Sequence, residues 1–188
     1  MEYTNRKLYG GAITLDIPKE FDDVSNVRVI PDHQEVFVDK FSECSIIVEI
    51  LDPIYTVGYG NNVAEYYFND ISEFNNSLNT KIMYSEPLSV YSNDLHISKC
   101  IGIQTLDKRY PEGVHREELN LYLLVLRIVS KNADIVISFN SPSKHSTSNQ
   151  PLHGTTDACF RKLTEMEIDE IMNKILRNFT INDYDLFV

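Results

Sequence analysis

The amino-acid sequence lacks the features that mark membrane and secreted proteins. None of its apolar runs approaches the roughly 20 residues that span a membrane, and residues 1–11 lack the apolar stretch of a secretory signal. It contains no tryptophan, yet 43% of its 188 residues are hydrophobic. This composition is globular rather than disordered, and the length suits one domain. We therefore expect a soluble protein in which residues 1–188 form a single domain.

Cysteine is also scarce. The three cysteines, Cys44, Cys100 and Cys159, are widely spaced and do not suggest a disulfide framework. Proteins of reducing compartments keep their thiols free. We therefore expect a protein of the cytoplasm or the nucleus.

Basic residues are fewer than acidic ones: the chain has 17 Lys and Arg and 28 Asp and Glu, which gives a net charge of −11. This charge disfavours nonspecific binding to nucleic acid or to anionic membranes and favours a basic partner. The first 60 residues contain eleven acids and five bases. More than half of the excess negative charge thus lies in the first third of the chain.

Short apolar segments with alternating or β-branched residues predict a sheet. Residues 35–39 and 45–51 are close in sequence and are expected to pair as antiparallel strands. Pro87 marks 81–91 as an edge strand or a broken one. Residues 22–34 are expected to be a turn-rich link. The charged segment 107–118 and the polar segment 141–163 are expected to be loops, the second of them mobile or functional. The other expected strands are 11–17, 97–106, 119–129 and 133–140.

The strand at 119–129 is apolar on both faces, so it must be covered on both sides. Two amphipathic helices are predicted to cover it. One begins at a cap formed by Asn62 and Glu65, and the other at a capping box of Thr164 and Glu167. We therefore predict an α/β (α+β) fold, an α/β/α sandwich in which a mainly antiparallel sheet of about six or more strands lies between helices.

Two adjacent glycines, Gly10 and Gly11, precede the strand at 11–17. Such a pair permits backbone angles that other residues avoid, or close approach by another segment, and suggests that this part of the chain is pinned against something. A phosphate-binding loop is the alternative. That loop needs more glycines and a Lys-Ser/Thr pair that opens a helix, and neither is present. The glycines are therefore expected to introduce a strand.

No residue pattern identifies a catalytic centre. The segment "GYGNNVA" at 58–64 lacks the third glycine and the later acid of a dinucleotide-binding loop. There is no G-x-S-x-G elbow and no cysteine with an evident base partner. We expect no cofactor and no metal, since the four candidate zinc ligands match no tight spacing: His145, His153, Asp157 and Cys159.

Glu49 is the most suggestive acid in the sequence. It would share a strand face with Ile47 and Leu51, so its carboxylate sits on a largely apolar face and must reach a rim or a partner. A solvated strand end is the alternative, and these residues alone favour neither.

Six segments carry a family resemblance. "LYGGAITLDIP", "DVSNVRVIPDHQEVFVD" and "SIIVEILD" occur in this order near the start, and "LRI", "ADIVISFN" and "DYDLF" occur later. Together they resemble the Ran guanine nucleotide release factors, also called Mog proteins. The similarity is clear over the first 52 residues and looser over 119–140 and 175–188, and elsewhere it extends only to the architecture.

The resemblance implies a fold shared with the PsbP proteins and binding to the small GTPase Ran, in its GTP-bound or nucleotide-free form. It also implies promotion of guanine nucleotide release in nuclear protein import, by a monomer of the nucleus and cytoplasm without a catalytic centre. A ternary complex with a second Ran-binding protein is left open. The alternative is a PsbP-like domain that binds a different protein or a small ligand. The positions implied to contact Ran are Asp23, Arg28, Asp32, Glu35, Glu49 and Asp52.

Overall fold

The computed structural model describes residues 1–54, 62–88, 94–110, 113–143 and 161–187. Its main element is a sheet of seven strands in the order β3-β4-β5-β9-β8-β7-β6. All neighbouring strands in it are antiparallel. The strands are β3 (Phe21–Asp23), β4 (Gln34–Asp39), β5 (Ser45–Leu51), β6 (Asn79–Leu88), β7 (Leu95–Tyr110), β8 (Gly113–Ile128) and β9 (Ala133–Pro142).

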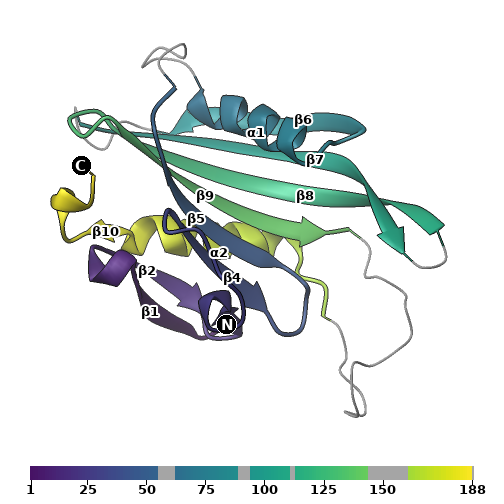
Figure 1. Cartoon of the computed structure of the whole chain (residues 1–188), viewed down its shortest axis with the longest axis horizontal. Coiled ribbons are helices and arrows are strands. Elements are labelled where there is room, and N and C mark those ends of the chain that lie inside the picture. Colours follow the sequence, from purple (N-terminus) through teal and green to yellow (C-terminus); the bar gives the residue numbers. More distant parts are fainter. Residues whose placement is uncertain (55–61, 89–93, 111–112, 144–160, 188) are drawn as a thin grey trace.

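A smaller antiparallel sheet, in the order β1-β2-β10, lies on one side of the large sheet (Figure 1). The sequence did not indicate this second sheet, and β1 lies in a polar segment, "YTNRKL", that shows no strand pattern. Its strands are β1 (Tyr3–Leu8), β2 (Ile13–Pro18) and β10 (Thr180–Ile181).

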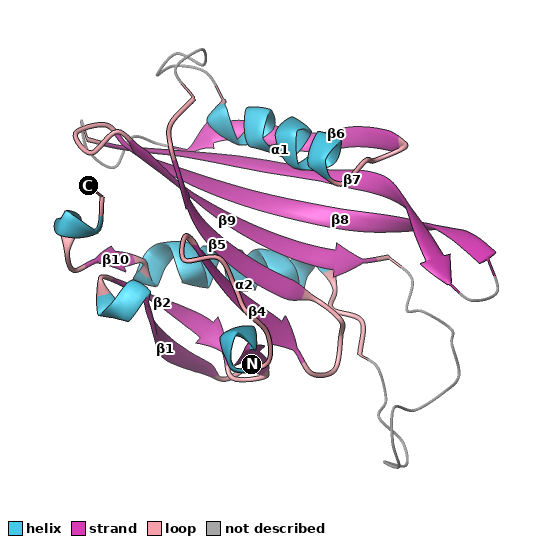
Figure 2. Ribbon diagram, in the orientation of Figure 1, coloured by secondary structure: helices cyan, strands magenta, loops and turns pink. Residues whose placement is uncertain are grey.

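Two helices complete the layers, and they lie on opposite sides of the large sheet (Figure 2). Helix α1 (Val63–Phe74) packs on β6, β7 and β8, whereas α2 (Glu165–Asn178) and the small sheet share the core on the other face. Short 3-10 turns lie at η1 (Tyr9–Gly11), η2 (Val24–Asn26) and η3 (Tyr184–Leu186). The predicted α+β sandwich is confirmed, with the small sheet as an addition.

Strand β8 is buried from both sides, as its sequence predicts. Leu121 and Leu123 point into the core under α1, while Tyr122 and Leu124 belong to the core under α2. Pro87 lies in β6, which is an edge strand of the large sheet, so the edge-strand prediction is confirmed.

The charged segment 107–118 was expected to be a loop, and this prediction is wrong. Strand β7 extends to Tyr110 and β8 begins at Gly113, with Asp107 opposite Arg116 and Lys108 opposite His115, while residues 111–112 lie outside the described residues. Lys108 Nζ also lies 2.7 Å from a carboxylate oxygen of Glu117. Because opposite charges are compatible with cross-strand pairing, a polar composition does not exclude a strand here.

The helix starts give one confirmed and one incorrect prediction. Thr164 and Glu167 form the predicted capping box, in which the Glu167 N–H donates to Thr164 Oγ1 at 3.2 Å. Asn62 occupies the N-cap position of α1, but its side chain makes no capping hydrogen bond and donates to Ser85 Oγ instead. The hydrogen bond to Ser85 ties the start of α1 to β6.

Two other expectations concern the chain around β3 and β9. Residues 22–34 were expected to be a turn-rich link, but Asp22 and Asp23 belong to strand β3. The expected loop at 141–163 starts later, because Ser141 and Pro142 belong to β9. Residues 144–160 of that segment lie outside the described residues.

Gly102 sets the distance between α1 and the sheet. A Cβ atom at this position would lie 2.6 Å from the Lys81 carbonyl oxygen and would collide with the Phe68 ring. We expect Gly102→Ala to lower the free energy of unfolding by about 1–3 kcal/mol, because overpacking displaces the helix or the neighbouring strand. Urea denaturation of the variant checks this, and a loss below about 0.5 kcal/mol would show that the contact relaxes freely.

Candidate protein-binding surface at one end of the sheet

Strand pairing brings most of the predicted contact residues together. Gln34, the first residue of β4, lies opposite Glu49 near the end of β5. The beginning of β4 and the end of β5 therefore share one end of the large sheet. We call this region the acidic sheet end, defined by Asp32, Glu35, Glu49 and Asp52.

The Glu35 carboxylate is occupied by a contact within the protein. Its Oε1 accepts a hydrogen bond from the Tyr9 backbone N–H at 2.7 Å, and the Tyr9 hydroxyl donates to the Val48 carbonyl at 2.8 Å. Burial raises the pKa of Tyr9, and the nearby carboxylates of Glu35 and Glu49 add to the effect. These contacts fix η1, where Gly10 has a φ of 68°, and confirm that the glycine pair belongs to a pinned segment.

Removal of this anchor has a predictable cost. We expect Glu35→Ala to lower the free energy of unfolding by about 1–3 kcal/mol, because the Tyr9 N–H loses a charged acceptor. Glu35→Gln retains an acceptor oxygen, so it should lower the free energy of unfolding by less than half as much as Glu35→Ala. Thermal and urea unfolding of the two variants checks this, and equal losses would contradict the role of the hydrogen bond.

Glu49 points to the opposite face of the sheet from Glu35. Its Oε1 accepts a hydrogen bond from the side-chain amide of Gln34, which lies directly opposite on β4. Adjacent residues of a strand alternate between faces, so Gln34 and Glu49 face the α1 side and Glu35 faces the small sheet. Charge reversal at Glu35 and Glu49 together would break two internal hydrogen bonds, and it is therefore a poor test of partner binding.

Asp23 and Arg28 lie along the segment that leads into β4. The Asp23 carboxylate accepts a hydrogen bond from the Ser25 N–H at 2.8 Å and caps η2. Arg28 is exposed, and its backbone N–H donates to the Val24 carbonyl at 3.1 Å. The Asp23 side chain thus has a local structural role, while the Arg28 guanidinium faces solvent.

Asp32 and Asp52 are the most accessible acids of the group. Both are exposed, and neither carboxylate makes a hydrogen bond or an ion pair with another residue in the described part of the chain. Asp52 borders a cavity of about 310 Å³. The cavity is also lined by His33, Ile50, Leu51, Lys131, Asn132, Ala133, Leu186 and Phe187.

Exposed valines beside Arg28 were missed by the sequence analysis. Val27 and Val29 expose 84% and 98% of their surface. The only available signal was two apolar residues in a segment expected to be a turn-rich link. Exposed apolar side chains are candidates for burial by a partner, because the buried core of an interface is more apolar than its rim.

A buried ion pair supports the other side of this region. Arg127 on β8 donates through Nε and Nη2 to the two carboxylate oxygens of Asp134 on β9, both at 2.7 Å, and the Tyr67 hydroxyl of α1 donates to Asp134 at 2.9 Å. Asp134 is fully buried and lies opposite Leu51 of β5. The network therefore ties α1 to β9 beside the end of β5, and Asp52 directly follows that strand end.

The described residues contain no group of three or more His, Cys, Asp or Glu placed to hold a metal ion. The four candidate zinc ligands of the sequence analysis and most of the 58–64 segment lie outside the described residues. Burial raises the pKa of the Cys100 thiol to about 11, which is opposite to the requirement of a nucleophilic thiolate. In the described ranges, no helix combines the length and apolar character that a membrane crossing requires.

Solved structures place the fold in a known class. The Saccharomyces cerevisiae Ran-binding protein Mog1p matches with a TM-score of 0.71 at 22% identity, over 100% of both chains. A cyanobacterial PsbP from Synechocystis matches with a TM-score of 0.53 at 8% identity, over 95% of this chain and 92% of that one. The protein thus has a PsbP-like α+β fold with carboxylates gathered at one sheet end.

Sequence comparisons identify the family within this class. The model of the family described as Ran-interacting Mog1 protein matches residues 6–142, and the chain belongs to that family. A probable ran guanine nucleotide release factor of Dictyostelium discoideum is 26% identical over 99% of this chain and 97% of its own. Nuclear import protein mog1 of Schizosaccharomyces pombe is 30% identical over 76% of this chain and 78% of its own.

Proposed function

We propose that this protein binds the small GTPase Ran and promotes release of its guanine nucleotide, in support of Ran-dependent nuclear protein import. The family match over residues 6–142 carries the proposal, because it includes both strands of the acidic sheet end. It also disfavours the alternative of a PsbP-like domain that acts on a different protein or a small ligand.

Asp32 and Asp52 supply the charge that a basic partner would meet. Both carboxylates are exposed and have no partner in the described part of the chain, so they can pair with lysine or arginine without breaking an internal contact. Val27 and Val29 add an apolar contact beside Arg28. In this proposal Glu35, Glu49 and Asp23 shape the surface, and each keeps its hydrogen bond within the protein.

Nucleotide release follows from thermodynamic linkage. A protein that binds nucleotide-free Ran more tightly than loaded Ran must weaken the affinity of Ran for nucleotide by the same factor. Carboxylates achieve this by binding the positive groups that otherwise hold phosphate. A tenfold effect requires about 1.4 kcal/mol of differential binding.

The proposal includes several finer points. No bond of the nucleotide changes, so the protein acts by binding and has no catalytic centre of its own. It acts as a monomer on GTP-bound or nucleotide-free Ran, in the nucleus and cytoplasm. A second Ran-binding protein that joins the complex would bind outside the acidic sheet end.

The test is the release rate of a fluorescent guanine nucleotide from purified Ran, loaded separately with the GTP or the GDP form. Addition of this protein should raise the rate by at least about tenfold for the preferred form. Size-exclusion chromatography on the same samples reports complex formation and its stoichiometry. Unchanged release, together with no complex, would overturn the proposed function.

A further inference from the structure

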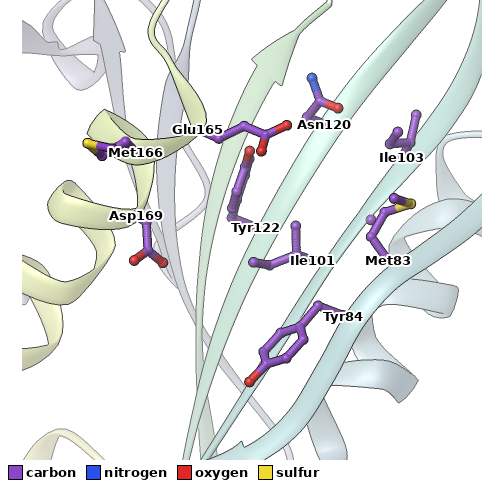
Figure 3. A pocket seen from close by; sticks show the side chains of 10 residues that line it. Met83, Tyr84, Ile101, Ile103, Asn120, Tyr122, Glu165, Met166 and Asp169 are labelled. Carbon is purple, nitrogen blue, oxygen red and sulfur yellow. The ribbon is translucent and has the colours of Figure 1, made fainter.

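A second cavity lies at the start of α2, against the face of the large sheet that carries α2 (Figure 3). Its volume is about 430 Å³, within the roughly 300–1,000 Å³ typical of ligand pockets. Its walls on the strands are largely apolar, and acids of α2 lie at one side. The residues that line it include Met83, Ile101, Tyr122, Glu165, Met166 and Asp169.

Tyr122 places an unpartnered polar atom at this cavity. The residue is only 6% exposed, and its hydroxyl makes no hydrogen bond with a described residue. Figure 3 shows the hydroxyl directed from β8 toward the first turn of α2, on the side of Glu165. Burial raises the pKa of Tyr122, and the carboxylates of Glu165 and Asp169 add to the effect. The Tyr122 hydroxyl oxygen itself keeps access to solvent, so a ligand group that enters the cavity can form a hydrogen bond with it.

The charge at the cavity is negative, and one carboxylate is available. Lys99 Nζ lies 2.6 Å from Asp169, so Asp169 already has a cation. Lys162, which lines the neighbouring cavity, donates to the Ser143 carbonyl at 3.4 Å. Glu165 is exposed and makes no hydrogen bond or ion pair with a described residue. A cationic ligand group therefore has a free carboxylate beside the free hydroxyl.

The apolar walls of the cavity favour a cationic side chain over a free ion as the ligand. Ile101 and the exposed Met83 and Met166 would cover the aliphatic stem of a long side chain, whose charged end reaches the polar groups. Arginine fits this arrangement better than lysine, because its guanidinium can donate to Glu165 and Tyr122 at the same time.

We propose that this cavity is a docking site for an arginine side chain carried by an exposed segment of a partner protein. The site is separate from the acidic sheet end. Asn120 beside the cavity and Arg127 beside Asp134 are seven residues apart on β8, about 23 Å at the rise of a strand. The cavity and the acidic sheet end therefore lie at different places along β8, and the inference does not depend on the identity of the partner at the acidic sheet end.

The methionines allow a direct test. The chain has four of them, and Met83 and Met166 line the cavity whereas Met1 and Met172 do not. We would label the methionine methyl groups with ¹³C and titrate the full chain with the peptide acetyl-Gly-Leu-Arg-Leu-Gly-amide. The matched probe is the same peptide with citrulline, which keeps the shape of arginine without its charge. The arginine peptide should shift the Met83 and Met166 signals saturably and bind about tenfold or more tightly than the citrulline peptide.

Two variants and a control make the test specific. Glu165→Gln and Tyr122→Phe should each weaken the arginine peptide, by about tenfold and about threefold, and neither removes a contact within the described structure. Glu170→Gln, an exposed neighbour on α2 outside the cavity lining, should bind like the natural chain. Three results would overturn the proposal. The first is equal affinity for the two peptides, and the second is an equal loss of peptide affinity in Glu165→Gln and Glu170→Gln. The third is the absence of any shift of the Met83 and Met166 signals at 10 mM peptide, about 100 times a Kd of 0.1 mM.

Discussion

Replacing Asp134 by alanine is expected to lower the free energy of unfolding by about 3–5 kcal/mol. The variant leaves the Arg127 guanidinium buried without the carboxylate that accepts two of its hydrogen bonds, and it removes the acceptor of the Tyr67 hydroxyl. Because Arg127 is 5% exposed, water cannot replace the lost partner. A loss of this size is a large share of the stability of a typical domain and should be visible as poor expression at 37 °C (a typical growth temperature).

Urea denaturation measures this loss, with Asp107→Ala as the matched control. Asp107 is also a strand aspartate near an arginine, but its carboxylate lies 3.8 Å from Arg116 on an exposed surface. The control should lose less than about 1 kcal/mol. Asp134→Asn keeps the shape and one acceptor oxygen and should fall between the two. If Asp134→Ala and Asp107→Ala lost the same free energy, the buried network would not support the fold in the way that its hydrogen bonds indicate.

Charge reversal at the exposed acids is expected to have the second largest effect. Asp32→Lys with Asp52→Lys should weaken Ran binding by at least about 100-fold, because two attractions to positive groups of the partner become repulsions. Neither side chain has a hydrogen bond or ion pair with a described residue, so the melting temperature should stay nearly unchanged. Biolayer interferometry on immobilised Ran measures the affinity, at two salt concentrations because charge effects are screened.

The control for this variant changes the net charge by the same amount elsewhere. Glu73→Lys with Asp107→Lys alters exposed residues on α1 and β7 at the far end of the large sheet. Its affinity for Ran should stay within about threefold of the natural chain. Similar losses in both double variants would mean that overall charge, and not the acidic sheet end, determines binding.

The elements predicted well are those whose signal is local. Apolar residues on both faces of β8 and the capping box of Thr164 and Glu167 appear directly in short stretches of sequence. The charged ends of β7 and β8 were missed, because a strand stabilised by pairing across a hairpin carries no apolar alternation. β1 was missed for the same reason.

The candidate surface was only partly predictable. Strand order along the chain places Glu35 and Glu49 near each other, but whether they face the same side depends on the register between β4 and β5. The hydrogen bond from Tyr9 to Glu35 joins residues 26 positions apart, and no sequence pattern specifies such a contact. The exposure of Val27 and Val29 likewise depends on the packing of neighbouring segments.

Release of nucleotide by this protein requires that it bind Ran differently according to the nucleotide that Ran holds. The decisive experiment measures the affinity of the purified chain for nucleotide-free Ran and for Ran loaded with GTP or GDP, by titration calorimetry under one buffer condition. We expect nucleotide-free Ran to bind at least about tenfold more tightly than one loaded form, with an equal loss of nucleotide affinity when the protein is present. Equal affinity for all three states would refute the proposed function, since such a protein could bind Ran but could not weaken its hold on nucleotide.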